Sequence, residues 1–315
     1  MKILIYGAGV LGSLCAARLQ SAGQEVWLLA RGQRLEDLRQ HGLVLENMVT
    51  DERSEMKVNV LETLGPDDSY DLIMVVVGKH QVPGVLTSLA ANRCTPNILF
   101  VGNNVAGPDE YIRALTQERV LLGFLTAGGT TDGPVVRYAE GDESRKSTFT
   151  IGEVDGTITP RLEEIAEVLK SIGYNLVLCP NIDAWLKTHA ALVAPLAGAL
   201  TLAGGDNFSL ARDRKNVRLA AKGIRESLHI LQSKNIPLIP SAAKLYIRLP
   251  EFLLVFLMQW LLARKEVGYA FAHADKAKPE MALLIHELLT LGRGTNVSTP
   301  ALARMRAGMG STASQ

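Results

Sequence analysis

A glycine-rich turn near the start of the chain has the residue types and spacing of a phosphate-binding loop. It follows an apolar stretch at residues 3–6, opens a helical pattern, and reads Gly7-Ala8-Gly9-Val10-Leu11-Gly12. In such a turn the first glycine permits the bend, the second lets a pyrophosphate approach, and the third lets helix and strand pack closely. The helix N-terminus adds N–H groups and a positive dipole end. This context predicts a dinucleotide site, although glycines also serve plain structural turns.

The second apolar run, residues 26–29, ends beside two arginines. NAD and FAD sites usually place Asp or Glu there, to accept hydrogen bonds from ribose hydroxyls. Here Arg31 and Arg34 come first, and the nearest carboxylate is Glu36. Guanidinium groups suit a ribose 2′-phosphate, which takes charged bidentate hydrogen bonds. We therefore expect NADP(H) rather than NAD or FAD; the alternative is a solvated loop with ordinary surface arginines.

The first 180 residues alternate apolar runs with helical patterns. Continuous apolar runs, which suit parallel strands buried on both faces, lie at residues 3–6, 26–29, 72–77 and 98–101. Helical patterns lie at residues 11–21, 82–91 and 160–173. The turn sequence Thr131-Asp132-Gly133-Pro134 predicts a hairpin-like addition. This alternation predicts an α/β fold with a Rossmann-type doubly wound sheet.

After Cys179-Pro180 the strand signal stops. Long helical patterns follow at residues 183–203, 209–234, 251–271 and 279–291. We therefore predict two domains, a Rossmann domain over residues 1–180 and an all-α C-terminal domain over residues 181–315. The most apolar stretch, residues 252–263, is shorter than the roughly 20 residues that span a bilayer. We expect a core or homodimer-interface helix there and no membrane anchor.

Composition excludes several classes of protein. Lys plus Arg number 33 and Asp plus Glu 32, so the chain has no strongly basic character for nucleic acid. Apolar residues make up 47% of the chain, enough for a sizeable core. The three cysteines are widely spaced, which argues against a disulfide framework or a cysteine-built metal site. We expect a cytoplasmic protein that binds a small molecule and no metal.

These features together resemble the ketopantoate reductase (2-dehydropantoate 2-reductase) family, NADPH-dependent enzymes of pantothenate biosynthesis. The likeness is firm over residues 1–130 and thinner afterwards. In that family a Rossmann domain precedes a helical domain, and Arg31 falls where the family places its phosphate-binding arginine. The resemblance implies a reductase that transfers hydride from NADPH to the carbonyl carbon of a 2-keto acid.

Two residues match the family's catalytic pattern. Asn103 follows the run at residues 98–101 and resembles a family Asn that contacts both nicotinamide and substrate. Trp185-Leu186-Lys187 reproduces a Trp two residues before the family's general-acid lysine, which also meets the substrate. A ketone that gains hydride develops negative charge on oxygen, which an ammonium can stabilise and protonate. The ordinary alternatives are a loop turn for Asn103 and a solvated surface lysine for Lys187.

Four further site residues are implied by the resemblance. Glu266 sits where the family has an acidic residue near cofactor or substrate, and Asn207 resembles a substrate-contacting Asn. Gly129 matches a cofactor-contacting segment. The family's Lys-x-x-Gln reads Gly78-Lys79-His80-Gln81 here, so the cofactor-site lysine, Lys79, comes one residue late.

The substrate half departs from the family. Asparagines that bind the hydroxyl end of ketopantoate are replaced by Ala191 and Ala194, and the expected serine falls in an apolar run near Leu254. Buried polar partners give large selectivity, so their loss predicts ketopantoate or a more apolar keto acid as substrate. The alternative is a catalytically silent NADP(H)-binding redox sensor or scaffold protein.

Overall fold

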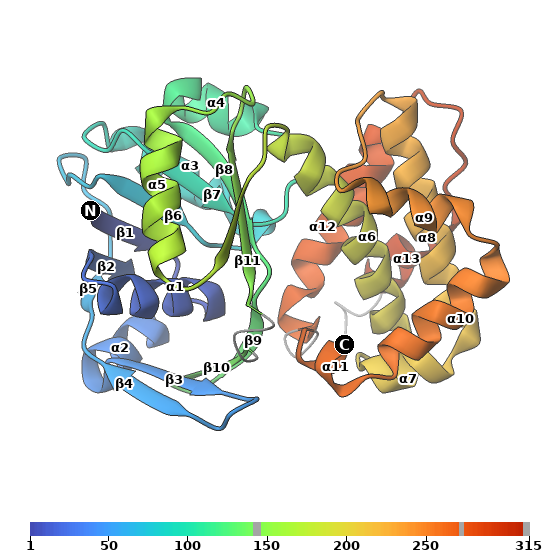
Figure 1. Ribbon diagram of the computed structural model, residues 1–315, viewed down its shortest axis with the longest axis horizontal. Helices are drawn as coiled ribbons and strands as arrows, with labels where there is room; N and C mark the ends of the chain where they lie inside the picture. Colours follow the sequence, from blue (N-terminus) through green and yellow to red (C-terminus); the bar gives the residue numbers. More distant parts are fainter. Residues whose placement is uncertain (141–145, 271–273, 311–315) are drawn as a thin grey trace. The chain divides into compact units, whose positions relative to one another are not determined.

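The computed structural model describes residues 1–140, 146–270 and 274–310 and divides into two compact units. Unit 1 comprises Met1–Gly102 and Pro108–Ile182, and unit 2 comprises Asn103–Gly107 and Asp183–Gln315. Unit 1 has the parallel α/β sheet and unit 2 is helical, which confirms the fold class (Figure 1). The short segment 103–107 groups with the helical unit, although the chain on both sides of it belongs to unit 1.

An eight-stranded sheet forms the centre of unit 1. In spatial order its strands are β12 (Asn175–Leu178), β11 (Thr148–Glu153), β8 (Val120–Leu125), β7 (Ile98–Val101), β6 (Leu72–Val75), β1 (Lys2–Tyr6), β2 (Glu25–Leu29) and β5 (Asn59–Leu61). All neighbouring pairs are parallel except β8 with β11. Every residue of β6 and β7 is buried, which explains their continuous apolar sequences. The strand order reverses between β1 and β6, the kind of point where α/β sheets bind ligands.

Helices connect these strands. They are α1 (Val10–Ser21), α2 (Gln33–His41), α3 (Pro83–Ala91), α4 (Asp109–Leu115) and α5 (Pro160–Ser171), with short 3-10 turns η1 (Lys79–Gln81) and η2 (Gln117–Arg119). The predicted α1, α3 and α5 are confirmed. Pro160 occupies the first turn of α5, and the Thr159 hydroxyl accepts the Leu162 N–H at 3.2 Å. Both features stabilise a helix N-terminus, so this start is encoded locally.

Unit 1 also contains a second sheet, of four strands. Its spatial order is β4 (Arg53–Met56), β3 (Leu43–Asn47), β10 (Val135–Ala139) and β9 (Gly128–Asp132). The antiparallel β9–β10 pair turns at Gly133, which has φ +54°, and this confirms the predicted hairpin. Strands β3 and β4 were not predicted. Three of the four β4 residues are exposed, so that strand has no apolar alternation to detect.

Unit 2 is built from α6 (Ile182–Leu202), α7 (Asn207–Arg212), α8 (Arg214–Ser233), α9 (Lys244–Arg248), α10 (Glu251–Leu262), α11 (Lys265–Ala270), α12 (Ala274–Leu291) and α13 (Pro300–Gly310), with the 3-10 turn η4 (Ser241–Ala243). Two predicted long helices are interrupted. The pattern at 209–234 breaks at Asp213, whose carboxylate accepts the Asn216 N–H at 3.0 Å and caps α8. The pattern at 251–271 breaks at Ala263, where α10 ends. Helix α13 was not predicted.

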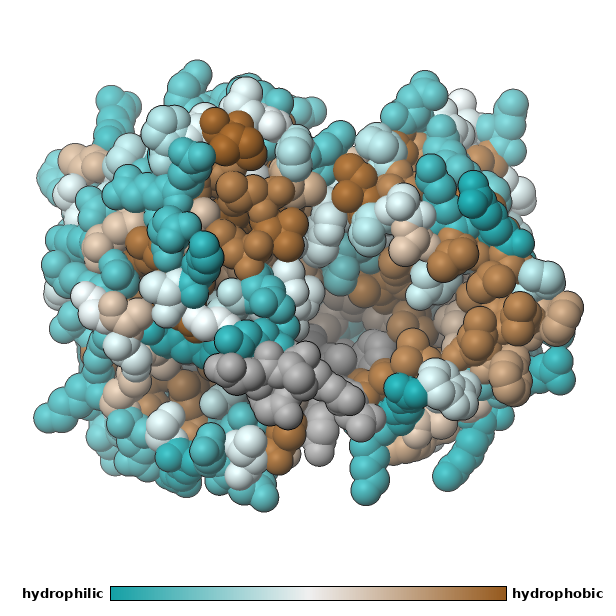
Figure 2. Space-filling model, viewed as in Figure 1, coloured by the Kyte–Doolittle hydropathy of each residue, from teal (hydrophilic) through white to brown (hydrophobic). Residues whose placement is uncertain are grey.

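Helix α10 is apolar on two faces. Leu254, Val255, Met258 and Leu262 are buried in the core of unit 2. The opposite face exposes Phe252, Phe256, Leu257, Trp260 and Leu261, and Figure 2 shows apolar side chains gathered over this helix. In the part of the chain that the structure describes, no helix combines the length and apolarity that crossing a bilayer requires.

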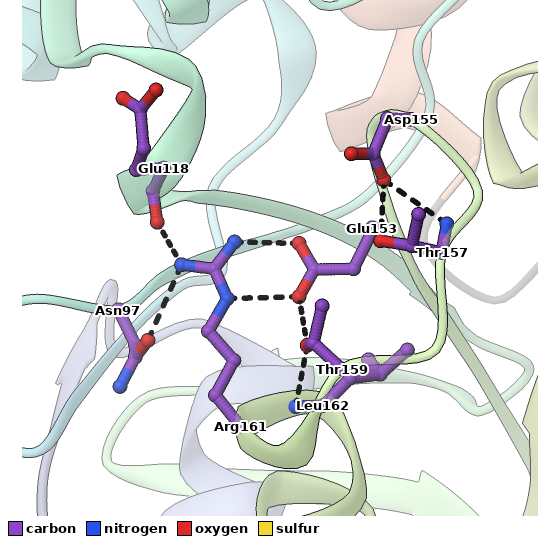
Figure 3. Close-up of polar contacts among 8 residues, drawn as sticks. All are labelled: Asn97, Glu118, Glu153, Asp155, Thr157, Thr159, Arg161 and Leu162. Atoms are coloured by element: carbon purple, nitrogen blue, oxygen red, sulfur yellow. Dashed lines mark hydrogen bonds and ion pairs between the residues drawn. The ribbon is translucent and has the colours of Figure 1, made fainter.

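A buried ion pair joins the end of β11 to the start of α5 (Figure 3). The Arg161 guanidinium donates to both carboxylate oxygens of Glu153, at 2.8 and 2.5 Å, and Glu153 is only 4% exposed. The Thr159 hydroxyl donates to the same carboxylate at 2.5 Å. Arg161 also donates to the Glu118 carbonyl and, at 3.5 Å, to Asn97. Glu153 therefore holds Arg161 at the start of α5, and Arg161 in turn contacts the segments that precede β7 and β8.

We predict that Glu153→Gln destabilises the protein by about 2–4 kcal/mol, because it leaves the Arg161 charge without its carboxylate partner. The matched control is Glu167→Gln, which removes the exposed Lys170–Glu167 pair at 3.4 Å and should cost less than about 1 kcal/mol. Urea unfolding measures the free energy of unfolding of both variants, provided that the m-value does not change. Equal losses in the two variants would show that the Glu153 cluster adds no stability beyond that of a surface pair.

Candidate active site

The glycine turn has the geometry that close phosphate approach requires. A Cβ added to Gly7 would lie 2.5 Å from the Val76 carbonyl oxygen, and one added to Gly12 would lie 1.9 Å from the Gly7 carbonyl oxygen. Both positions therefore need glycine for packing, and Gly7 also has φ +118°. A Cβ on Gly9 would meet nothing within 4 Å. Gly9 thus leaves open space where a dinucleotide phosphate needs it.

The N-terminus of α1 lies at this turn. Helix α1 begins at Val10 with Gly9 as its N-cap, and its ladder starts with the Ser13 N–H donating to the Gly9 carbonyl at 2.9 Å. The preceding amides, which include those of Val10, Leu11 and Gly12, have no intrahelical acceptor by helix geometry. With Ala8 they form the anion-binding end of a helix, so the residues present fit a dinucleotide.

The two arginines after β2 occupy different environments. Arg31 is exposed, and one of its terminal nitrogens donates to the Tyr6 hydroxyl at 2.8 Å. Arg34 is half-buried and donates to the Ala8 carbonyl at 3.1 Å, the Ser13 hydroxyl at 3.1 Å and the Pro134 carbonyl at 2.8 Å. Arg34 therefore braces the glycine turn against the β9–β10 turn, whereas Arg31 keeps most of its donors exposed.

Lys79 and Gly129 also lie in unit 1. Lys79 is 4% exposed, and its Nζ lies 3.0 Å from the Tyr111 hydroxyl and 3.6 Å from a Glu110 carboxylate oxygen. Gly129 belongs to β9, and a Cβ there would lie 2.8 Å from the Val10 side chain. Gly129 thus lets the second sheet pack against the first residue of α1. The structure engages Lys79 with protein groups at the start of α4.

In unit 2, Asn103 lies against a carboxylate that sequence reasoning missed. Its Nδ2 donates to Glu280 Oε1 at 3.2 Å. Its Oδ1 is buried and has no hydrogen-bond partner among the described residues. An amide oxygen in this state is costly unless a donor satisfies it. It therefore marks a place where a ligand N–H or O–H would be stabilised.

The other residues of the segment 103–107 are fixed by hydrogen bonds within the segment and with α12. Asn104 donates to the Gly107 carbonyl at 2.9 Å and accepts the Gly107 N–H at 3.1 Å. One carboxylate oxygen of Glu287, on α12, accepts the N–H groups of Val105 and Ala106 at 3.2 and 3.1 Å. These bonds fix the conformation of the segment that carries Asn103.

Lys187, on α6, lies close to Gly107, the last residue of the same segment. It is 8% exposed and pairs with Asp183, one turn earlier on α6. A Cβ on Gly107 would lie 3.3 Å from Lys187 Nζ, so glycine lets the backbone approach the ammonium closely. Asp183 Oδ1 is buried without a hydrogen-bond partner among the described residues. The segment thus has Asn103 at its start and the Lys187–Asp183 pair at its end.

The remaining predicted site residues have other surroundings. Glu266 belongs to α11, but its side chain lies outside the described residues. Asn207 is buried, and its amide donates to the carbonyls of Leu262 and Arg264 at 2.8 and 3.2 Å, which closes the end of α10. At the positions where the family resemblance implies polar substrate-binding residues, the chain has Ala191, Ala194 and Leu254. All three are buried in the core of unit 2.

Sequence reasoning missed Asp183 and Glu280 for different reasons. Asp183 precedes Lys187 by four residues, a spacing that places both side chains on one helix face and could have been noticed. Glu280 is separated from Asn103 by 177 positions, and nothing in the single sequence marks it apart from other helix carboxylates. Only the fold brings it to the segment 103–107.

The fold and these residues define a dinucleotide-binding α/β protein with a lysine, an amide and carboxylates in its helical unit. A family model described as ketopantoate reductase PanE/ApbA matches residues 3–156. A 2-dehydropantoate 2-reductase of Archaeoglobus fulgidus is 31% identical over 210 residues, 65% of this chain and 66% of that protein. The chain thus matches just under two thirds of that relative's length.

Solved structures share the fold over nearly the whole chain. A D-mandelate dehydrogenase structure with NADH and anilino(oxo)acetate has a TM-score of 0.81 at 18% identity and covers 99% of this chain and 97% of that one. A 2-dehydropantoate 2-reductase from Geobacter metallireducens has a TM-score of 0.79 at 17% identity and covers 99% of this chain and 100% of that one. The first half of the chain is thus similar to the ketopantoate reductase family, and nearly the whole chain has the fold of these solved oxidoreductase structures.

The open space at Gly9 gives a direct test of the glycine turn. We predict that Gly9→Ala leaves the melting temperature unchanged but weakens NADPH binding at least about tenfold, or about 1.4 kcal/mol, because the methyl group fills the phosphate space. Gly12→Ala should instead destabilise the fold, since its Cβ would overlap the Gly7 carbonyl. Fluorescence titration and thermal melting separate the two effects. Unchanged NADPH affinity in Gly9→Ala would contradict a dinucleotide site here.

His189, on α6, gives a pH-dependent prediction. Its ring stacks on Trp185 with centroids 5.3 Å apart, and burial lowers its pKa to about 4. The unfolded chain binds the proton near pH 6.5 and the folded chain only near 4, so stability falls as pH drops through this window. The loss should be on the order of 1–3 kcal/mol.

Urea unfolding at pH 7.5 and pH 4.5 measures this loss. His189→Gln should lose less stability than the parent protein between the two pH values, while the control His286→Gln, at an exposed position of α12, should match the parent. An identical pH dependence in His189→Gln and parent protein would contradict the assignment.

Proposed function

We propose that this protein is an NADPH-dependent reductase that converts the carbonyl group of a 2-keto acid to a hydroxyl group. The proposal rests on the segment 103–107. It begins with Asn103, whose Oδ1 has no hydrogen-bond partner among the described residues, and it ends with Gly107, which lies beside the ammonium group of Lys187. The similarity of residues 3–156 to the ketopantoate reductase family supports the reaction class. NADPH, when bound, supplies hydride to the carbonyl carbon.

The glycine turn and Arg31 would hold the dinucleotide. The amides at the start of α1 suit the pyrophosphate, and the exposed guanidinium of Arg31 suits a 2′-phosphate. The related fold of D-mandelate dehydrogenase was solved with NADH. The arginine at the end of β2, where NAD sites usually have a carboxylate, is our reason to propose NADPH for this chain.

Lys187 would act as the general acid. When a carbonyl carbon accepts hydride, its oxygen gains negative charge and needs one proton to become a hydroxyl. The Lys187 ammonium can donate that proton from Nζ, and Asp183 stabilises the charged lysine before the transfer. The same ion pair holds Nζ beside Gly107, at the end of the segment that begins with Asn103.

Asn103 would orient the reacting groups, and Glu280 would orient Asn103. Because Glu280 can only accept when ionised, its contact with Nδ2 fixes which end of the amide is the donor. Oδ1 is then left to accept from a ligand. We therefore include Glu280 in the proposed site because of its hydrogen bond with Asn103. This does not depend on the role expected for Glu266.

We propose a substrate whose side chain is more apolar than that of ketopantoate. At the positions where the family resemblance implies asparagines for the hydroxyl end of ketopantoate, this chain has Ala191 and Ala194, whose methyl groups cannot hydrogen-bond a hydroxyl group. A structural relative is named for mandelate, a 2-hydroxy acid. We therefore expect 2-keto acids with branched or aromatic side chains to be reduced faster than ketopantoate.

Lys187→Met tests the mechanism. NADPH oxidation is followed with ketopantoate and with a panel of branched and aromatic 2-keto acids. Loss of the acid should lower kcat about 10²- to 10⁴-fold, while NADPH affinity changes less than about twofold. Lys170→Met, at an exposed position of α5, is the matched control and should keep full activity.

Each outcome decides between named alternatives. Full turnover in Lys187→Met would remove the proposed acid. Tight NADPH binding by the parent protein without reduction of any keto acid in the panel would favour the silent NADP(H)-binding sensor. Faster turnover of ketopantoate than of the apolar acids would overturn the substrate proposal and leave the reaction class standing.

A further inference from the structure

Tyr6 is the last residue of β1, directly before the glycine turn, and it contacts two other elements. Its side chain is 2% exposed, yet its hydroxyl lies 3.1 Å from the Ser88 hydroxyl on α3 and 2.8 Å from a terminal nitrogen of Arg31. The Arg31 guanidinium carbon is 5.9 Å from the Tyr6 ring centroid. Tyr6, at the end of β1, thus contacts Arg31, which follows β2.

The direction of these hydrogen bonds is fixed by their partners. The Ser88 hydroxyl donates to the Val85 carbonyl at 2.9 Å, which uses its single proton. Ser88 must therefore accept from Tyr6, whose hydroxyl proton is then used in turn. Arg31 can only donate, so the Tyr6 oxygen accepts from it. The result is an ordered chain that runs from Arg31 through Tyr6 and Ser88 to the backbone of α3.

This chain restricts an otherwise mobile side chain. Arginine has large rotamer freedom, and an exposed arginine must lose that freedom when it binds an anion. Tyr6 takes one of the five N–H donors of Arg31 and leaves four for a ligand. Because the phenol is buried and itself anchored, it can hold the guanidinium in one place before binding.

We propose that Tyr6 is a positioning residue for coenzyme preference: it holds Arg31 ready for the 2′-phosphate of NADPH through the hydrogen-bond chain to Ser88. The inference rests on the proposed NADPH-dependent function. It assigns Tyr6 no contact with the coenzyme. Its effect should therefore be confined to ligands that carry the 2′-phosphate.

Binding of adenosine 2′,5′-bisphosphate, compared with 5′-AMP, tests the proposal without any turnover. The two probes differ by the 2′-phosphate, and isothermal titration measures both affinities. Tyr6→Phe keeps the ring but removes the acceptor, and should weaken the bisphosphate about three- to tenfold, the effect of one hydrogen bond. The affinity for 5′-AMP should change less than about twofold. Ser88→Ala should weaken the bisphosphate by a smaller factor.

Two further variants make the result decisive. In an Arg31→Ala background, Tyr6→Phe should have no additional effect, because the group that it positions is gone. Tyr246→Phe, on α9 of unit 2, is the matched control and should bind both probes like the parent protein. NADPH and NADH affinities measured by fluorescence should show the same selective loss in Tyr6→Phe.

The outcomes separate this inference from the proposed function. If Arg31→Ala weakens the bisphosphate and Tyr6→Phe does not, Arg31 binds the phosphate unaided and the inference is wrong. If Tyr6→Phe weakens both probes equally, its role is structural and the inference is also wrong. If Arg31→Ala leaves both affinities unchanged, the NADPH preference itself fails.

Discussion

The candidate site depends on how α12 holds a five-residue segment of backbone. Residues 103–107 leave the sheet unit and group with the helices, and the N–H groups of Val105 and Ala106 end on one carboxylate oxygen of Glu287. A charged acceptor gives these backbone N–H groups a stronger hydrogen bond than a neutral one. With the segment fixed, Asn103 meets Glu280 and Gly107 meets Lys187. The surroundings of two candidate site residues, Asn103 and Lys187, thus depend on one set of loop contacts.

Local signals made much of unit 1 predictable from sequence. Apolar runs with no alternation identified β1, β6 and β7, because both faces of those strands are buried. Pro160 located the start of α5. Strand β4 escaped because its exposed Arg, Ser and Glu side chains carry no pattern. Its pairing with β3 is a tertiary preference that local propensity does not contain.

Residues of the candidate site could be proposed from the sequence where a short contiguous segment contains them. The glycine turn is contiguous, and its three glycines have separate steric reasons that spacing alone suggests. Lys187 could be proposed through the family resemblance, because a tryptophan lies two residues before it. Glu280 could not, because its meaning comes from Asn103, which is distant along the chain. Arg34 shows the opposite limit: its residue type suited a phosphate, but three contacts with the protein hold it as a brace for the turn.

The spacing of the two α12 carboxylates has a consequence for how the sequence of this protein can vary. Glu280 and Glu287 are seven residues apart, which is almost two full helical turns, so both lie on one face of the helix. A single insertion or deletion between them would rotate one carboxylate by about 100° relative to the other. The segment would then lose either its backbone acceptor or the orientation of its amide. The length of this stretch of helix is therefore under the same constraint as the identity of its residues, and a sequence can keep both glutamates and still lose the site.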